Sequence, residues 1–185
     1  NTIHFGGQWC WFYAIGLIPM AEVFAIEFTS PIWTALLAAA FLGERITPRR
    51  MVAILLGFVG VLVVIRPGIV EVHFASLMAL MAAMGYAVNY TITRAMTRTE
   101  SALAIVFYMN LIQFPIGLAL SAHAWVTPSP ALWPWMLVIG VVGVFSHLCI
   151  ARAMASADAA LVAPLDFLRL PSIAIVAYLI YDEAL

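Results

Sequence analysis

The stretch Ala21–Glu44, AEVFAIEFTSPIWTALLAAAFLGE, is long enough and apolar enough to cross a lipid bilayer as a helix. Glu22 and Glu27 nevertheless lie near one end of it, and Pro31 interrupts its middle. Charged side chains at membrane depth are costly, and they usually face the interior of a helix bundle or a water-filled cavity. The stretch therefore predicts a membrane helix that does more than anchor the chain in lipid.

The same pattern returns near the end of the chain. Shifting the sequence by 139 positions places Glu44 on Glu183, and further pairs match without a gap. These pairs are Cys10 with Cys149, Ala14 with Ala153, Ala21 with Ala160, Val23 with Val162, Phe28 with Phe167, Ala35 with Ala174, Ala38 with Ala177 and, as similar acids, Glu27 with Asp166. Alanine matches arise easily in so apolar a chain, whereas the Cys, Phe and Glu matches do not. We interpret the sequence as two halves built on one plan.

The composition indicates that lipid is the solvent for most of this chain. Hydrophobic residues make up 65% and charged residues 9% of its 185 positions, against roughly 25% charged residues in a soluble domain. The formal net charge of −1 and the lack of a basic run exclude the electrostatic footprint of a nucleic-acid-binding protein. We therefore expect an integral membrane protein that contacts the lipid bilayer and has no nucleic-acid partner.

Apolar runs separated by short polar or Pro- and Gly-containing breaks predict about seven transmembrane helices in an all-α, polytopic protein. The expected spans are approximately 5–18, 20–42, 51–65, 74–94, 102–122, 135–154 and 157–181. The third should end at Arg66-Pro67-Gly68, because Pro and Gly stop helices.

The arginines set the orientation of these spans. All eight basic residues are arginines; the Arg45–Arg50 loop follows the second span, Arg94–Arg98 follows the fourth, and Arg152 closes the sixth. These loops share one face of the membrane, and the positive-inside rule predicts that this face is cytoplasmic. The second span and its copy, the seventh, then run in opposite directions, so the two repeats are inverted. Inverted repeats are typical of secondary transporters, whose substrate lies between the halves.

Two runs of the sequence resemble the drug/metabolite transporter superfamily, EamA type. FYAIGLIPMAEVFAIEFTSPIWTALLAAAFLGERITPRRMVAILLGFVGVLVVIRPG resembles its first half, and ARAMASADAALVAPLDFLRLPSIAIVAYLIYDE resembles its second half. The most specific elements are Gly43-Glu44-Arg45 at a helix end, the Gly57-x-x-Gly60-Val61 helix and the Arg66-Pro67-Gly68 stop.

The resemblance implies ten helices in two inverted five-helix repeats, around a cavity that opens alternately to either side of a bacterial inner membrane. Residues 1–68 would be the latter part of the first repeat, helices three to five, and residues 69–185 most of the second, helices six to nine. The chain would then be a fragment that lacks the first, second and tenth helices. The family's substrates range over amino acids, nucleotide derivatives, vitamins and drugs. The sequence around Asp166 is similar to that of family members that carry S-adenosylmethionine or organic solutes.

Charges at membrane depth are the main candidates for a substrate site. Asp166 and Arg169 are three positions apart on the last span, so they share a helix face and can pair. His147 lies at a similar depth, and Glu27 is the repeat equivalent of Asp166. One interpretation is a polar cluster that binds charged groups of a substrate, with His147 or Asp166 able to carry a proton. The other is a neutral pair that fixes helix packing, with His147 a hydrogen-bonded core residue. Glu44 and Glu183 are expected to be structural and to close helix ends or pair with an arginine such as Arg45.

Amide and aromatic side chains could line the same cavity. Tyr86, Asn89 and Tyr90 follow i, i+3, i+4 spacing, so they make one polar-aromatic face of a helix within lipid depth. Such a face suits a flat or amphipathic organic solute, although packing in lipid explains any single residue as well. The further candidates are Gln8, Trp9, Tyr13 and Trp33, with Asn110 and Gln113 on the fifth span.

Two classes of function fit these residues. The first is a secondary transporter that moves a small organic metabolite by alternating access, driven by a proton or by solute exchange. The alternative is a membrane-embedded enzyme that uses His147, Asp166 and Glu27. No H-E-x-x-H, C-x-x-C, G-x-S-x-G or P-loop pattern is present. We therefore predict a transporter and not an enzyme, with no catalytic residues, metal or cofactor. The sequence does not define its oligomeric state.

Overall fold

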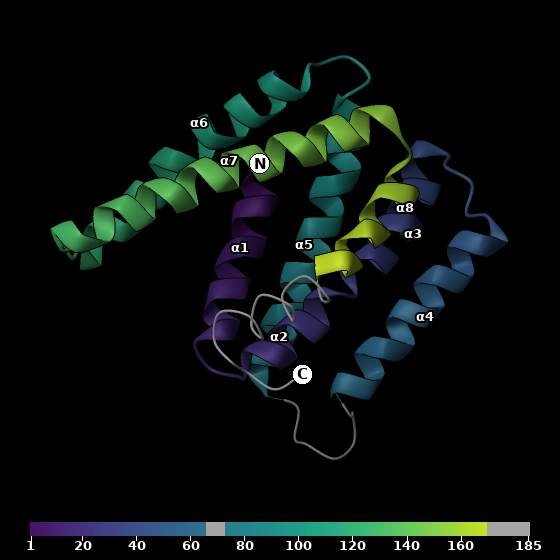
Figure 1. Ribbon diagram of the computed structural model, residues 1–185, viewed down its shortest axis with the longest axis horizontal. Coiled ribbons are helices and arrows are strands. Elements are labelled where there is room, and N and C mark those ends of the chain that lie inside the picture. The colour runs from purple at the N-terminus through teal and green to yellow at the C-terminus, as the bar shows by residue number, and fades with distance from the viewer. Residues whose placement is uncertain (66–72, 170–185) are drawn as a thin grey trace.

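A computed structural model of the protein describes residues 1–65 and 73–169 (Figure 1). The features expected at Arg66-Pro67-Gly68 and at Glu183, and the part of the last expected span after Arg169, lie outside the described residues. Within them every regular element is helical. The elements are α1 (Thr2–Ile15), α2 (Met20–Glu27), α3 (Ser30–Leu42), α4 (Pro48–Ile65), α5 (Phe74–Met96), α6 (Ala102–Ser121), η1 (Ala122–Ala124), η2 (Pro130–Leu132), α7 (Trp133–Ser156), α8 (Ala159–Val162) and η3 (Ala163–Leu168).

Helix α5 is the centre of the bundle and contacts α1, α2, α3 and α7 (Figure 1). Its inward face is built from alanines, which let the neighbouring backbones approach closely. The alanines with no exposed surface on this face are Ala75, Ala79, Ala82, Ala83 and Ala87. Small residues therefore take the place that large apolar side chains hold in a soluble core.

The closest approach joins α1 to α5 at Gly7 and Gly85. A Cβ atom built on Gly7 would lie 3.3 Å from the carbonyl oxygen of Ala82, and one built on Gly85 would lie 3.3 Å from the Cα atom of Gly7. Both neighbours are backbone atoms that cannot rotate away. Glycine at these two positions therefore sets the distance between the two helices.

Gly7→Leu is expected to lower the free energy of unfolding by about 1–3 kcal/mol, because the added side chain forces α1 away from α5. Gly6→Leu is the matched control, since nothing lies within 4 Å of a Cβ atom at Gly6, and it reports the change in helix propensity alone. Denaturant unfolding of both variants in detergent micelles measures the difference. Equal stabilities would contradict the close packing of α1 on α5.

Each half of the chain contains a break in a helix, and the sequence indicates the position of that break only approximately. The second expected span is two helices, α2 and α3, with Phe28 and Thr29 between them. Pro31 has no N–H to bond the carbonyl of Glu27, so the helix bends at this point. The last expected span begins as the four-residue α8 and tightens into the 3₁₀-helix η3, where Pro164 likewise removes a donor. The interruption that Pro31 predicts in the second span is thus present, and it separates two helices.

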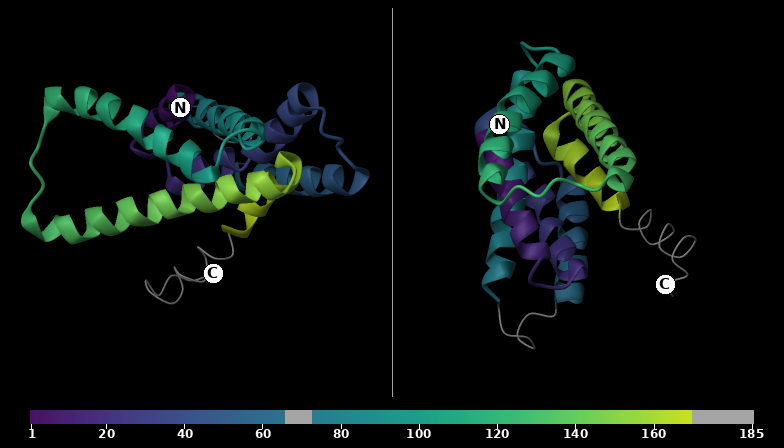
Figure 2. Two further views of the ribbon diagram at one scale, coloured as in Figure 1. Left: turned by 90° about the horizontal axis from the view of Figure 1, so that it is seen from above. Right: turned by 90° about the vertical axis from the view of Figure 1, so that its left-hand side faces the viewer.

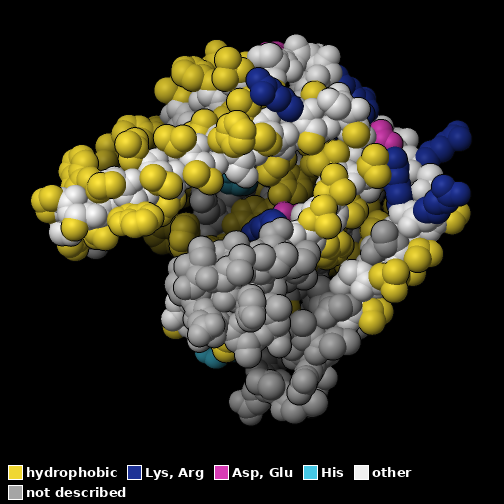
Figure 3. Space-filling model, viewed as in Figure 1, with side chains coloured by type: hydrophobic (Ala, Val, Ile, Leu, Met, Phe, Trp, Pro, Cys, Tyr) yellow, Lys and Arg dark blue, Asp and Glu magenta, His cyan; other side chains and the backbone are white. Residues whose placement is uncertain are grey.

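Helices α6 and α7 form an arm that extends beyond the other helices (Figure 2). Hydrophobic side chains cover the arm on the face shown in Figure 3, and Ile139 and Phe145 on α7 are 70% and 64% exposed. Among the described residues, four segments have the length and hydropathy of membrane spans: Glu22–Leu42, Phe74–Met96, Ala102–Ser121 and Pro130–Ser156. The protein is therefore an all-α, polytopic membrane protein, as its composition predicts.

The ends of α3, α5 and α7 that carry the arginine-rich loops meet in one polar cluster. The carboxylate of Glu44 accepts hydrogen bonds from the backbone N–H groups of Ala159 and Ala160, both at 3.1 Å, and so caps the start of α8. Arg94 Nε donates to Glu44 at 3.3 Å, and Arg94 Nη1 donates to the carbonyl oxygen of Met154 at 2.7 Å.

Asp158 completes this cluster. Arg50 and Arg94 approach its carboxylate at 3.0 and 3.5 Å. Glu44 thus has the structural role expected of it, but its arginine partner is Arg94, whereas the sequence pointed to its neighbour Arg45. The cluster joins three loops that the arginine pattern assigns to one face of the membrane.

Candidate functional site

A cavity of about 380 Å³ lies between α1, α2, α5, α7 and η3. This volume is in the range of small-molecule binding sites. Figure 3 shows a hollow in this region of the molecule, with acidic, basic and histidine side chains at its edge. The residues that line the cavity are His4, Gln8, Trp11, Phe12, Glu27, Tyr86, Tyr90, Ser146, His147, Ile150, Asp166 and Arg169.

Three charged side chains meet at one side of the cavity. Arg169 Nη1 donates to both carboxylate oxygens of Asp166 at 3.1 Å and to Glu27 Oε1 at 3.1 Å. Glu27 ends α2, whereas Asp166 and Arg169 belong to η3 and its C-cap. The predicted pair of Asp166 with Arg169 thus forms, and Glu27 joins it from the other half of the chain.

Glu27 is the most enclosed member of this charged trio (Glu27, Asp166 and Arg169). Its side chain is 9% exposed, compared with 21% for Asp166 and 43% for Arg169. Trp11 Nε1 on α1 donates to Glu27 Oε2 at 2.7 Å, so both oxygens of this carboxylate accept a hydrogen bond. A buried carboxylate that accepts one hydrogen bond from a cation and one from a neutral N–H group is held in a fixed orientation toward the cavity.

The bend after α2 is what positions Glu27. Thr29 Oγ1 donates to the carbonyl oxygen of Ile26 at 2.7 Å, and it accepts a hydrogen bond from Trp33 Nε1 at 3.2 Å. These local bonds stabilise the end of α2 where Pro31 removes a backbone bond. Trp33 therefore supports the bend, and it does not line the cavity.

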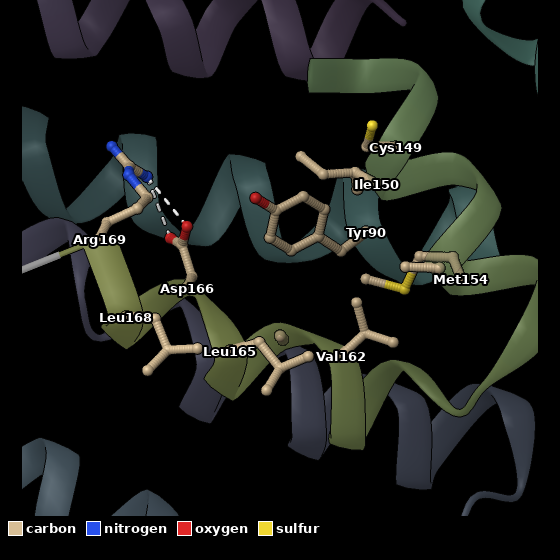
Figure 4. A pocket seen from close by; sticks show the side chains of 11 residues that line it. Tyr90, Cys149, Ile150, Met154, Val162, Leu165, Asp166, Leu168 and Arg169 are labelled. Atoms are coloured by element: carbon tan, nitrogen blue, oxygen red, sulfur yellow. Dashed lines mark hydrogen bonds and ion pairs between the residues drawn. The ribbon is translucent and has the colours of Figure 1, made fainter. Parts of the chain in front are cut away.

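A second cavity of about 470 Å³ adjoins the first and shares four of its lining residues: Tyr90, Ile150, Asp166 and Arg169. Figure 4 shows that the Tyr90 side chain lies between α7 and the α8–η3 segment, with its hydroxyl group toward Asp166. The remaining wall is apolar, with Met154, Val162 and Leu165 among its residues. The charged trio thus lies between an apolar chamber and a more polar one.

Two histidines form the opposite side of the polar chamber. The rings of His4 on α1 and His147 on α7 meet edge to face, with centroids 5.1 Å apart. Gln113 Nε2 on α6 lies 3.0 Å from His4 Nδ1, and the Tyr86 ring lies 5.6 Å from the His4 ring. His147 is therefore in contact with His4 from the first half of the chain, at the cavity as the sequence suggested.

The structure brings seven of the predicted site residues together around this cavity. They are Gln8, Glu27, Tyr86, Tyr90, His147, Asp166 and Arg169. It does not bring Trp9, Tyr13, Trp33 or Asn89 to the cavity wall; Trp9 and Tyr13 are 57% and 45% exposed on α1. Of the residues predicted on the fourth span, Tyr86 and Tyr90 line the cavity, and of those predicted on the first span, only Gln8 does.

Helix spacing could have found the residues of α1 that the sequence analysis missed. His4, Gln8 and Trp11 are spaced i, i+4, i+7, which places all three on one helix face. That face meets Tyr86 on α5 and Glu27 on α2. Ser146 on α7 was also missed, and its position beside His147 is the signal that could have indicated it.

A charged and aromatic cavity between the helices of a membrane protein is typical of membrane transport proteins. A family model confirms this class: residues 2–66 and 73–185 match the EamA-like transporter family. The chain belongs to this family. Because its members are transporters, the alternative of a membrane-embedded enzyme finds no support.

Several curated proteins are similar to this chain. A riboflavin transporter of Brucella anthropi is 32% identical over 201 residues, which cover all of the chain and 71% of that protein. An S-adenosylmethionine uptake transporter of Rickettsia prowazekii is 29% identical over 97% of the chain and 61% of its own length. A pseudopaline exporter of Pseudomonas aeruginosa is 31% identical over 83% of the chain and 55% of its own length. The chain thus spans between 55% and 71% of the length of these three relatives. No solved structure matches it.

Proposed function

We propose that the protein is a secondary transporter of a small organic metabolite and that it works by alternating access around the Glu27–Asp166–Arg169 trio. The observation that carries this proposal is the position of the trio. It joins α2 to η3, segments 142 positions apart in the sequence at the Arg169–Glu27 contact, inside a cavity of metabolite size. Two of the named relatives are transporters of riboflavin and of S-adenosylmethionine, and both are molecules with a flat ring system that suits aromatic walls.

The inverted-repeat arrangement supports this mechanism. In an inverted repeat, residues near the pseudo-two-fold axis lie close to their own copies. Phe28 and Phe167, equivalent under the shift of 139 positions, stack with centroids 5.6 Å apart. Their neighbours Glu27 and Asp166, also equivalent, bind the same nitrogen of Arg169. We infer that the axis between residues 1–68 and 69–185 passes beside the charged trio, where alternating access would expose a substrate first to one side and then to the other.

The polar cluster at the arginine-rich loops supports a particular orientation of the transporter in the membrane. Glu44, Arg50, Arg94 and Asp158 hold the ends of α3, α5 and α7 together. We propose that this end faces the bacterial cytoplasm, in line with the positive-inside rule. The cluster would then close the cytoplasmic mouth in the arrangement seen here. Movement is driven either by a proton or by exchange of one solute for another.

The test is a counterflow assay with the full-length protein in proteoliposomes. Vesicles preloaded with unlabelled riboflavin or S-adenosylmethionine should accumulate the same labelled compound, saturably and without ATP. Glu27→Gln is expected to lower this exchange roughly ten- to hundredfold, since a hydrogen bond to a charged group contributes about 1.5–3 kcal/mol.

Glu22→Gln is the matched control, because Glu22 also lies on α2 but accepts its hydrogen bond from Ser76 at 2.8 Å, away from the cavity. Its exchange should stay within about twofold of the unaltered protein, as expected for a residue outside the site. Equal exchange by the Glu22 and Glu27 variants would remove the charged trio from the transport path.

A further inference from the structure

The charged trio and two phenylalanines form a cage around a positive charge. The guanidinium carbon of Arg169 lies 5.8 Å from the centroid of the Phe24 ring and 5.9 Å from that of Phe28. The carboxylates of Glu27 and Asp166 both bind the same guanidinium at Nη1. Carboxylates combined with aromatic faces are the chemistry by which proteins recognise organic cations.

The cavity carries more negative than positive charge. Two carboxylates, Glu27 and Asp166, face one guanidinium. The other titratable groups that line this cavity from α1, α5 and α7 are His4, His147, Tyr86 and Tyr90. None of them carries a permanent positive charge as Arg169 does. The two carboxylates therefore share one guanidinium, and the described groups of the wall supply no second fixed cation to balance the second negative charge. In a low-dielectric setting such a charge strongly favours a ligand that brings a positive one.

Arg169 can leave the cage without disturbing the fold around it. Its side chain is 43% exposed, whereas that of Glu27 is 9% exposed. Its three hydrogen bonds in the trio all run through one nitrogen, Nη1. The long side chain starts at the C-cap of η3 and can swing its head group into the adjoining chamber, which Arg169 also lines. Glu27, by contrast, is held by Trp11 and cannot follow it.

Building on the proposed transport function, we propose that the substrate is an aromatic organic cation and that Arg169 occupies its cationic subsite in the empty transporter. Glu27, Asp166 and the rings of Phe24 and Phe28 bind the positive group of the substrate. Trp11, Tyr86 and Tyr90 contact its flat ring. Arg169 pairs with both carboxylates between substrates, because leaving them without any cation at membrane depth would be costly. The arriving cation displaces the guanidinium, so Arg169 is a competitor of the substrate.

Binding of probe pairs to the full-length protein tests this proposal. Each pair differs by one methyl group and a positive charge: 1-methylnicotinamide against nicotinamide, and S-adenosylmethionine against S-adenosylhomocysteine. Isothermal titration in detergent is expected to show at least tenfold tighter binding of a cation than of its neutral partner. Glu27→Gln should remove most of that preference and leave affinity for the neutral compound unchanged. Arg169→Gln should tighten binding of the cation several-fold, whereas Arg169→Lys, which keeps the competing charge, should not.

The outcomes separate this inference from the transport proposal. The inference is overturned if a neutral compound binds the unaltered protein as tightly as its cationic partner, a comparison that requires no variant. It is also overturned if none of the cations in the set binds. Weaker cation binding by Arg169→Gln also overturns it, because Arg169 would then anchor the substrate. Riboflavin counterflow with any of these results leaves the transport proposal intact, whereas cation binding without counterflow of any compound supports the subsite and contradicts transport.

Discussion

Replacing Glu44 by alanine is expected to lower the free energy of unfolding by about 3–5 kcal/mol, the usual result of breaking a buried ion pair from one side. The Glu44 side chain is 5% exposed and that of its partner Arg94 is 18% exposed. The change leaves Arg94 without this carboxylate and removes the acceptor for two backbone N–H groups at the start of α8. Denaturant unfolding of the full-length protein in detergent micelles measures the loss.

Arg45→Ala is the control for this effect. Arg45 is the next residue in the chain, its side chain is exposed, and its carbonyl oxygen, which accepts from Arg50 at 3.3 Å, survives the substitution. Its variant should change stability by less than about 0.5 kcal/mol, as expected for a surface substitution. If Glu44→Ala behaved like Arg45→Ala, the cluster would not hold the ends of α3, α5 and α7 together.

The same cluster shows which features of the fold the sequence could predict. The arginine pattern grouped the loops that follow the second, fourth and sixth spans, and these loops do meet through Arg50, Arg94 and Asp158. Composition alone was sufficient for the all-α membrane class. The partner of Glu44 could not be predicted, because Arg45 and Arg94 are equally good ion-pair partners until the packing of α3 against α5 is known. Local sequence favours the nearer residue, whereas the tertiary structure selects the one 50 positions away.

The candidate site was predictable where repeat symmetry and helix spacing agreed. Glu27 was chosen as the equivalent of Asp166, and both bind Arg169. Tyr86 and Tyr90 were chosen by spacing, and both line the cavity. For α1 the composition did not indicate which face lines the cavity, because polar and aromatic side chains occur on all sides of that helix. Trp9 and Trp11 are alike in residue type, and they are distinguished by the helix spacing of Trp11 with His4 and Gln8 and by its contact with Glu27.

The bends at the ends of α2 and α8 illustrate a different limit. Pro31 and Pro164 indicate that a backbone bond is lost, but not whether the helix continues with a kink or stops. In this protein the chain bends at Phe28 and Thr29 and tightens to a 3₁₀-helix at Ala163. Each bend brings one acidic residue, Glu27 or Asp166, to the cavity. The departures from a regular helix are thus the features that build the candidate site.

Phe28→Ala is expected to lower the free energy of unfolding by about 3–5 kcal/mol, because it leaves a void where the two halves meet. Phe28 is 2% exposed and stacks on Phe167 at an interplanar angle of 30°. Phe167 cannot move to fill the void on its other side without losing contact with α4, where a Cβ atom added at Gly57 would overlap the Phe167 ring. The void therefore persists, and the variant loses both packing and the aromatic face beside Arg169.

Two further variants make this result specific to the stack. Phe28→Leu keeps most of the buried volume and should cost less than about 1.5 kcal/mol, while cation preference still falls because the ring is gone. Phe145→Ala removes a ring that is 64% exposed on the arm, so it should change stability little. Unfolding in micelles and the nicotinamide probe pair measure the two effects separately. If Phe28→Ala cost no more than Phe145→Ala, the contact between the repeat equivalents would not hold the halves together, and the axis would have to pass elsewhere.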